Sequence, residues 1–293
     1  MKKMFMAVIA FMMTISASAQ FYIYCSDGNV IKVDSISMVA PEESEEPTPP
    51  AGIGTFSVSA DKQVTFSKGN LQYTQSTNTW SFAENQYDYL GEANIAIDAD
   101  VLADKVDLFG WSTSATNFGL STSTDWENDY LGSFVDWGTN KIGNDAPNTW
   151  RTLTYDEWEY LLNTRPNASS LKGVAQVNDV NGLILLPDNW TCPGGVTFKS
   201  GFHSEWGAQY YAAYQTFTAD QWSKLESAGA VFLPAVGNRY GSSVGNVQYY
   251  GRYWSATENN STTAGYLYFD SNEAYMGLGN RDEGLSVRLV KDL

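Results

Sequence analysis

The sequence predicts an α+β protein with short strands, two main helices and long loops. Short runs of β-branched and aromatic residues alternate with turns rich in Gly, Asn, Asp and Ser. Two segments carry a strong helix-start signal. Of the 293 residues, 43% are hydrophobic and 17% are charged, so the chain can build a core and disorder is excluded as its main state.

The charge balance excludes some classes of partner. The chain has 33 acidic and 17 basic residues, which gives a net charge of -16. A field of that sign repels nucleic acid and anionic membrane surfaces, so neither is a predicted partner. The single histidine, His203, leaves too few ligands for the usual His-rich metal sites. No cofactor is predicted.

The first 19 residues have the pattern of a secretory signal peptide. Lys2 and Lys3 precede an apolar run from Met4 to Ile15, and small residues at 17–19 supply a cleavage site. The run is too short to span a bilayer, and no later stretch is long enough. We therefore expect export to the cell surface or the extracellular space, with the periplasm as an alternative and no direct membrane insertion.

Two short segments follow the signal peptide. Residues 20–40 predict a β-hairpin, because β-rich runs flank the tight-turn pair Asp27-Gly28. A lone hairpin is marginal in water, so we expect it to add its strands to the main domain or to another subunit. Residues 41–52 hold four prolines and four glutamates and predict an extended linker. The main domain is predicted over 53–293.

Strands and helices are predicted at specific places in the main domain. Residues 56–59 are expected to pair with 63–66, and 71–73 with 79–82. Capping boxes at Thr154 and Thr218 predict two helix starts, each followed by an apolar stripe. The stripes consist of Trp158, Leu161 and Leu162 in the first helix, and Trp222 and Leu225 in the second. Gly229 suits the left-handed stop of the second helix.

The C-terminal segment alternates with the period of a β-strand. Over 266–270, Leu267 and Phe269 are predicted to point inward, with Tyr266, Tyr268 and Asp270 outward. Over 273–278 the two sets are Ala274, Met276 and Leu278 against Glu273, Tyr275 and Gly277. A third strand over 285–290 would bury Val287 and Leu289. Tyrosines among Gly, Asn, Ser and acids are typical of binding surfaces, although they can also simply cover a solvated sheet.

Several motifs of the chain resemble FISUMP-type domains, relatives of the formylglycine-generating enzyme fold that form a large group of exported proteins from gut Bacteroidales. The resemblance covers about 54–292 and implies a C-type-lectin-like fold. Its motifs include Gly69-Asn70-Leu71-Gln72-Tyr73, Asn148-Thr149-Trp150-Arg151-Thr152-Leu153-Thr154, Tyr253-Trp254-Ser255-Ala256-Thr257 and Ser286-Val287-Arg288-Leu289-Val290.

Some members of that group are variable proteins of diversity-generating retroelements, and residues 252–285 look similar to their variable region. The resemblance implies a fixed scaffold of Tyr253, Trp254, Leu267, Phe269, Val287 and Arg288. It implies display, and hence ligand binding, at Arg252, Thr263, Tyr266, Tyr268, Tyr275, Gly277, Leu278, Gly279, Asp282, Glu283 and Leu285. Glu273 and Glu283 cannot arise from an asparagine codon by changes at its adenines, so either these two are fixed or the chain is an ordinary paralogue.

The sequence gives little support for catalysis. The formylglycine-generating enzymes use two cysteines late in the domain, and this chain has none after Cys192. Cys25 and Cys192 either form a disulfide or are two separate buried thiols. His203 is interpreted as a surface or locally hydrogen-bonded imidazole, and Arg288 as a structural ion-pair partner.

No metal site is predicted either. The sugar-binding tripeptides of calcium-dependent lectins are absent. The densest acidic spacing, Asp98, Asp100, Asp104 and Asp107, lacks the glycine and terminal glutamate of an EF-hand loop. We interpret it as a solvated acidic face.

These observations predict an exported, non-catalytic binding protein. Tyr266, Tyr268 and Tyr275 would anchor the ligand, and Arg252, Asp282 and Glu283 would set its charge preference. The expected partner is a protein or glycan, for example on another cell or on a phage. The alternative is a structural subunit of a surface appendage that assembles through the 20–40 hairpin.

Overall fold

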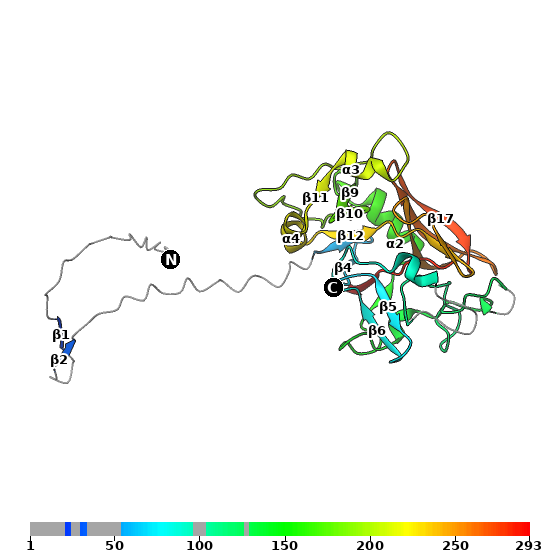
Figure 1. Ribbon diagram of the computed structural model, residues 1–293, viewed down its shortest axis with the longest axis horizontal. Coiled ribbons are helices and arrows are strands. Elements are labelled where there is room, and N and C mark those ends of the chain that lie inside the picture. The colour runs from blue at the N-terminus through cyan, green and yellow to red at the C-terminus, as the bar shows by residue number, and fades with distance from the viewer. Residues whose placement is uncertain (1–20, 25–29, 34–53, 96–103, 126–128) are drawn as a thin grey trace. The chain divides into compact units, whose positions relative to one another are not determined.

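A computed structural model describes residues 21–24, 30–33, 54–95, 104–125 and 129–293 (Figure 1). It is a mixed α+β protein with several small sheets and few, short helices, which confirms the predicted fold class. Contacts within the chain divide it into Met1–Thr48 and Pro49–Leu293. The predicted signal peptide and the 41–52 linker lie outside the described residues.

The N-terminal unit contains the predicted hairpin. Strand β1 (Phe21–Tyr24) pairs antiparallel with β2 (Val30–Val33), with Phe21 opposite Val33 and Tyr24 opposite Val30. The two strands form a two-stranded sheet.

The first and last strands of the second unit share one sheet. Its order is β3 (Phe56–Ser57), β4 (Gln63–Phe66), β18 (Leu289–Asp292) and β8 (Arg151–Thr152). The β3–β4 pair confirms one predicted hairpin. Strand β18 begins at Leu289, later than the predicted 285, because residues 285 and 286 form only isolated bridges with Phe109 and Tyr253. Val287 and Leu289 are nevertheless buried as expected.

Two further sheets flank the first. One has the order β6 (Thr79–Phe82), β5 (Leu71–Thr74), β7 (Lys105–Val106), and its β5–β6 pair confirms the second predicted hairpin. The other contains β11 (Thr216–Phe217), β9 (Lys172–Val177), β10 (Val180–Leu185) and β12 (Val231–Pro234) in that order. Figure 1 shows these two sheets in different parts of the unit, with the C-terminus beside β4.

Both predicted helices begin at their capping boxes. Helix α2 (Tyr155–Glu159) starts after Thr154 and continues as a π-helical turn, Tyr160–Thr164. Helix α4 (Ala219–Ser227) starts after Thr218, and Gly229 just beyond it has φ of +94°. The sequence did not reveal α3 (Gln209–Tyr214), because its N-cap, Ala208, makes no side-chain capping bond. Short 3-10 turns span Gly91–Ile95, Trp137–Thr139 and Ala168–Ser170.

The C-terminal alternation forms an antiparallel sheet of three strands. They are β15 (Tyr250–Glu258), β16 (Thr263–Asp270) and β17 (Ala274–Asn280), with β16 in the middle. The β15–β16 register shifts between Trp254 and Glu258. A separate small hairpin joins β13 (Asn238–Tyr240) to β14 (Ser243–Gly245).

Within the described part of the second unit, three hydrophobic clusters form the core. One includes Phe56, Trp158 and Leu233 together with Tyr253, Leu267, Phe269 and Met276 from the C-terminal sheet. A second is rich in aromatic residues and includes Trp80, Phe109, Trp111, Trp137, Trp254 and Leu285. The third lies between α4 and the sheet of β9, β10 and β12, and includes Trp222, Leu225 and Phe232. The C-terminal sheet therefore contacts two clusters, one through each face.

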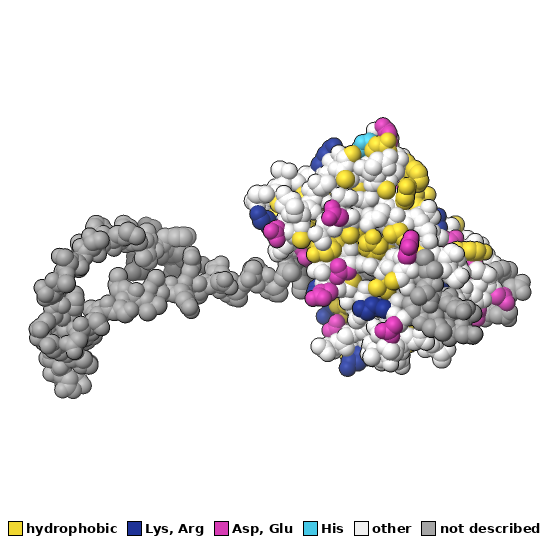
Figure 2. All heavy atoms as spheres, in the orientation of Figure 1, with side chains coloured by type: hydrophobic (Ala, Val, Ile, Leu, Met, Phe, Trp, Pro, Cys, Tyr) yellow, Lys and Arg dark blue, Asp and Glu magenta, His cyan; other side chains and the backbone are white. Residues whose placement is uncertain are grey.

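The surface of the second unit mixes apolar and charged side chains. On the face drawn in Figure 2, hydrophobic side chains gather in a band near β12, with acidic and basic side chains around it. Among the described residues, no helix is long and apolar enough to cross a membrane.

Candidate ligand-binding surface

One face of the C-terminal sheet brings tyrosines together across three strands. Arg252 of β15 is opposite Tyr268 of β16, which in turn is opposite Tyr275 of β17. Directly opposite residues place their side chains on the same side of a sheet. By the same register, Tyr266 shares this side. We define the tyrosine face as Tyr250, Arg252, Tyr266, Tyr268 and Tyr275.

The rings of the tyrosine face contact one another and surround the guanidinium of Arg252. Tyr268 lies 5.4 Å from Tyr250 and 4.9 Å from Tyr275, centroid to centroid. The Arg252 guanidinium carbon is 5.0 Å from the ring centroids of Tyr250 and Tyr266 and 5.9 Å from that of Tyr268. Such cation–π contacts hold the rings in place before any ligand arrives.

The charge of Arg252 is paired within the protein. Its Nη1 lies 2.6 Å from Glu283 Oε2, and both side chains are mostly buried. Burial raises the pKa of Glu283, although the Arg252 charge opposes that effect. Burial alone would lower the pKa of Arg252, but the surrounding tyrosines and Glu283 raise it. Arg252 and Glu283 were each predicted to set the charge preference for the ligand. In the structure they form an ion pair that carries no net charge.

The tyrosine hydroxyls keep their protons at neutral pH. Burial raises the pKa of Tyr250, Tyr266, Tyr268 and Tyr275. The Tyr250 hydroxyl donates to Asn238 Oδ1 at 2.7 Å and accepts from Asn246 Nδ2 at 2.8 Å.

The face is graded from buried to exposed. Tyr266 is 7% exposed, Arg252 and Tyr268 are half-buried, and Tyr275 is 42% exposed. Half-buried rings next to exposed ones give a rigid surface with accessible apolar area. Such surfaces suit binding, because little side-chain entropy is lost on contact.

Two aromatic residues outside the predicted segment belong to the same region. Trp206 is 52% exposed and lies 5.5 Å from the ring of Tyr249, which is 41% exposed. Tyr249 directly precedes Tyr250 of the tyrosine face, and a Trp206 hydrogen bond lowers the otherwise raised pKa of Tyr268. The sequence gives one indication of Trp206 and Tyr249, because both are large aromatic residues within polar loops. It has no periodic pattern that connects them to β15–β17.

The predicted display of Tyr266 is wrong in part, and the two nearby glycines explain why. The Tyr266 ring packs with Trp254, at 6.3 Å, and joins the second core cluster. A Cβ on Gly277 or Gly279 would meet atoms of this ring at 2.9 Å and 2.6 Å. These glycines therefore make room for Tyr266 and are not free display positions.

Four other outward positions also differ from the prediction. Leu285 is fully buried in the second core cluster, with its backbone paired to Phe109. Asp282 is buried near the Arg239 guanidinium. Asp270 is buried because its carboxylate accepts from Asn272 N, Glu273 N and the Tyr268 hydroxyl, closing the turn after β16. Thr263 is half-buried at the opposite end of the sheet, where its hydroxyl accepts from Asn259.

The inward set is largely confirmed. Leu267, Phe269 and Met276 are buried in the first core cluster. Leu278 belongs to this side of β17 by its register, yet it is 52% exposed because β17 is the edge strand. Leu278 is therefore accessible, as the resemblance implied, but on the side of the sheet away from the tyrosine face. All six predicted scaffold residues are buried.

Arg288 is structural, but the predicted ion pair is wrong. Its buried guanidinium bonds to Gln86 Oε1 at 2.6 Å and to Asn70 Oδ1 and the Lys68 carbonyl at 3.4 Å. Desolvation lowers its pKa to about 10. Neutral oxygens thus bind both terminal nitrogens of this cation, while its buried Nε has no hydrogen-bond partner among the described residues.

His203 and Cys192 show no reactive arrangement with other described residues. His203 Nδ1 accepts from Glu205 N at 3.0 Å, and its ring stacks on Tyr210 at 4.5 Å, as expected for a locally bonded imidazole. Cys192 is exposed, so the predicted alternative of a buried thiol is wrong for this residue. Cys25, its partner in the predicted disulfide, lies outside the described residues.

The predicted acidic face is wrong for Asp107. Its carboxylate is buried and accepts from Asn94 Nδ2 and Leu90 N, each at 2.8 Å. Desolvation raises the pKa of Asp107 to about 6. Asp104 is exposed, while Asp98 and Asp100 lie outside the described residues. No group of three or more metal-ligating side chains occurs in the described part of the chain.

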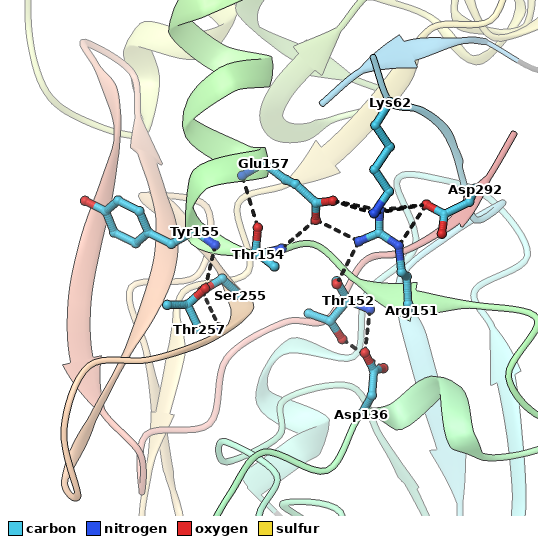
Figure 3. A network of polar contacts seen from close by, with 10 residues as sticks. All are labelled: Lys62, Asp136, Arg151, Thr152, Thr154, Tyr155, Glu157, Ser255, Thr257 and Asp292. Atoms are coloured by element: carbon cyan, nitrogen blue, oxygen red, sulfur yellow. Dashed lines mark hydrogen bonds and ion pairs between the residues drawn. The ribbon is translucent and has the colours of Figure 1, made fainter. Parts of the chain in front are cut away.

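A second polar cluster joins α2 to the sheet that ends the chain (Figure 3). The Glu157 carboxylate forms ion pairs with Arg151 at 2.7 Å and with Lys62 at 3.0 Å. Arg151 also forms an ion pair with Asp292 at 2.7 Å. These bonds lower the pKa of Glu157 despite its burial. Asp136 bonds the Thr152 backbone at 2.9 Å. The charged side chains of this cluster pair with one another and connect neighbouring parts of the fold. We therefore interpret the cluster as structural.

Comparison with known proteins gives one partial match. A family model described as a domain of unknown function (DUF8237) matches residues 211–290. The match contains the whole C-terminal sheet and the tyrosine face, but not Trp206. No curated protein and no solved structure matches the chain.

Proposed function

We propose that this chain is an exported, non-catalytic ligand-binding protein, similar to a receptor or adhesin, that recognises a protein or glycan through its tyrosine face. The single observation that carries the proposal is the Arg252-centred cluster of rings. Four tyrosines from three strands are held in fixed positions, and the outermost is 42% exposed. Tyrosine, tryptophan and arginine are the residues that dominate binding energy at interfaces.

The anchors differ in role from those expected from the sequence. Tyr275, Tyr249 and Trp206 offer exposed ring area for contact. Tyr268 and Tyr250 support them, and Tyr266 fixes the base of the cluster against Trp254. Because Arg252 is neutralised by Glu283, the face favours apolar and hydrogen-bonding contacts over a strongly charged ligand.

The C-type-lectin-like fold and the FISUMP relationship are part of this proposal. The motif residues Tyr253, Trp254 and Arg288 are all buried where the motifs require a scaffold, which supports the relationship. Diversification of residues 252–285 stays a prediction. A reverse transcriptase gene and a near-copy of the 3′ end in the neighbouring DNA, differing at adenines, would test it.

Binding can be tested with variants of the exposed rings. We expect the purified protein to bind selectively on a glycan array or to peptides from a phage-displayed library. Replacing Trp206 and Tyr275 with Ala should abolish that binding, because both expose large ring areas. The melting temperature should stay nearly unchanged, since exposed substitutions usually alter stability by about 0.5 kcal/mol or less.

A matched control is Tyr240→Ala, because Tyr240 is 56% exposed and makes no ring contact with the tyrosine face. This variant should bind like the wild type. Absence of selective binding on both probes, or equal binding by all three proteins, would contradict the proposed function.

A second candidate function rests on the β1–β2 hairpin. Two-stranded sheets are marginal on their own, so an added strand from a neighbouring subunit would stabilise the hairpin. The chain would then be a subunit of a surface appendage. Deleting residues 21–39 should abolish assembly, measured by light scattering, while ligand binding is retained; unchanged assembly would argue against this role.

A further inference from the structure

A hollow of about 400 Å³ lies away from the C-terminal sheet. It is bounded by β3, β4, β18 and β12 and by the segment that follows α4. Its lining includes Phe56, Phe66, Trp150, Val231, Lys68 and Lys291. Its volume is in the range of small-molecule sites, which are mostly apolar with a few placed polar groups.

The apolar wall of the hollow is held rigidly. Phe56 and Phe66 are buried and meet edge to face at 5.0 Å. Trp150 packs edge to face on Phe82 at 5.1 Å, and its indole N–H donates to Asp145 at 2.9 Å. Because these rings are fixed by their own contacts, the hollow does not need to be built by its ligand.

Two exposed lysines also line the hollow. Lys68 and Lys291 form no ion pair with any other described residue, in a chain that has nearly twice as many acidic as basic residues. Thr65 is the cross-strand partner of Lys291, which places both on the same side of their sheet. The acidic side chain in the lining is Glu226, whose Oε1 accepts from Gln86 Nε2 at 2.9 Å.

We propose that this hollow binds a small apolar organic anion. The hydrocarbon part of such a ligand would lie against Phe56, Phe66 and Trp150, and its anionic group would lie near Lys68 and Lys291. The lining carries two lysine side chains against one acidic side chain, and the Glu226 carboxylate is already hydrogen-bonded. This site is separate from the tyrosine face, so its failure would leave the proposed function untouched.

A matched pair of probes tests both features of the ligand. We expect calorimetric titration of the full chain to show binding of 3-phenylpropionate, with about five- to tenfold weaker binding of the neutral 3-phenylpropan-1-ol. Lys68→Gln combined with Lys291→Gln should remove that preference and leave the affinity for the alcohol unchanged. Thr65→Trp should fill the hollow and abolish binding of both probes.

The control keeps the net charge of the lysine variant. Lys105→Gln combined with Lys141→Gln removes two exposed lysines outside the hollow and should bind both probes like the wild type. The proposal is overturned if the wild type binds neither probe, if it binds both equally, or if the two double variants behave alike. The lysine variants alter exposed side chains only, so melting temperatures should confirm that all proteins are folded.

Discussion

At the scale of single residues, the tyrosine face shows how one buried ring restricts the size of the side chains beside it. Tyr266 lies across two glycines of β17 and against Trp254, so its burial depends on small side chains opposite it. The alternation of the sequence placed Tyr266 on the correct side of the sheet. Its burial could not be predicted, because the core cluster that its ring joins also contains residues far away in the sequence, such as Phe109 and Trp137.

The packing of Tyr266 predicts the effect of adding one methyl group. Gly279→Ala would place its Cβ 2.6 Å from the ring and should destabilise the protein by about 1–3 kcal/mol, because the ring has to move. Urea unfolding measures this cost. In a Tyr266→Ala background the same change should cost much less. An equal cost in both backgrounds would show that the ring is not the cause.

At the scale of elements, the features that depend on local sequence were the most predictable. The two capping boxes are closed as the sequence indicated, and the strand pairs β3–β4 and β5–β6 are joined by short turns. Helix α3 was missed because it has no capping side chain. Trp206 was missed because only the folded chain brings its loop near Tyr249.

The capping box of α4 gives a testable estimate. Thr218 Oγ1 accepts from Gln221 N at 3.2 Å, and Gln221 Oε1 accepts from Thr218 N at 2.9 Å. Thr218→Ala should lower the free energy of unfolding by about 1 kcal/mol. The control is Ser223→Ala, at an exposed position of the same helix. It should raise the free energy of unfolding by roughly a few tenths of a kcal/mol. Equal effects of the two substitutions would contradict a capping role.

At the scale of the whole molecule, buried charge makes stability depend on pH. Desolvation raises the pKa of Asp107 from 3.8 to about 6, so the folded protein binds this proton more tightly than the unfolded chain does. The stabilisation is therefore complete below pH 3.8 and is lost as the pH rises through about 6. A shift of that size corresponds to roughly 3 kcal/mol.

Asp107→Asn isolates this contribution. We expect the wild type to lose stability relative to the variant between about pH 4 and pH 6, measured by urea unfolding at several pH values. Above that range the difference should be constant. Carboxylates with lowered pKa, such as Glu157 and Asp292, act in the opposite direction at lower pH but are common to both proteins. A difference that does not vary with pH would refute the assignment.

The position of β18 between β4 and β8 has a consequence for how the protein is made. Residues 289–292 complete a sheet whose other strands come from residues 56–66 and 151–152, so this sheet cannot close until residues 289–292 have been translated. Until then, the edges of β4 and β8 that pair with β18 stay unpaired. Chaperones can bind a nascent chain in that state. Translation of more than 130 residues after β8 therefore precedes closure of this sheet.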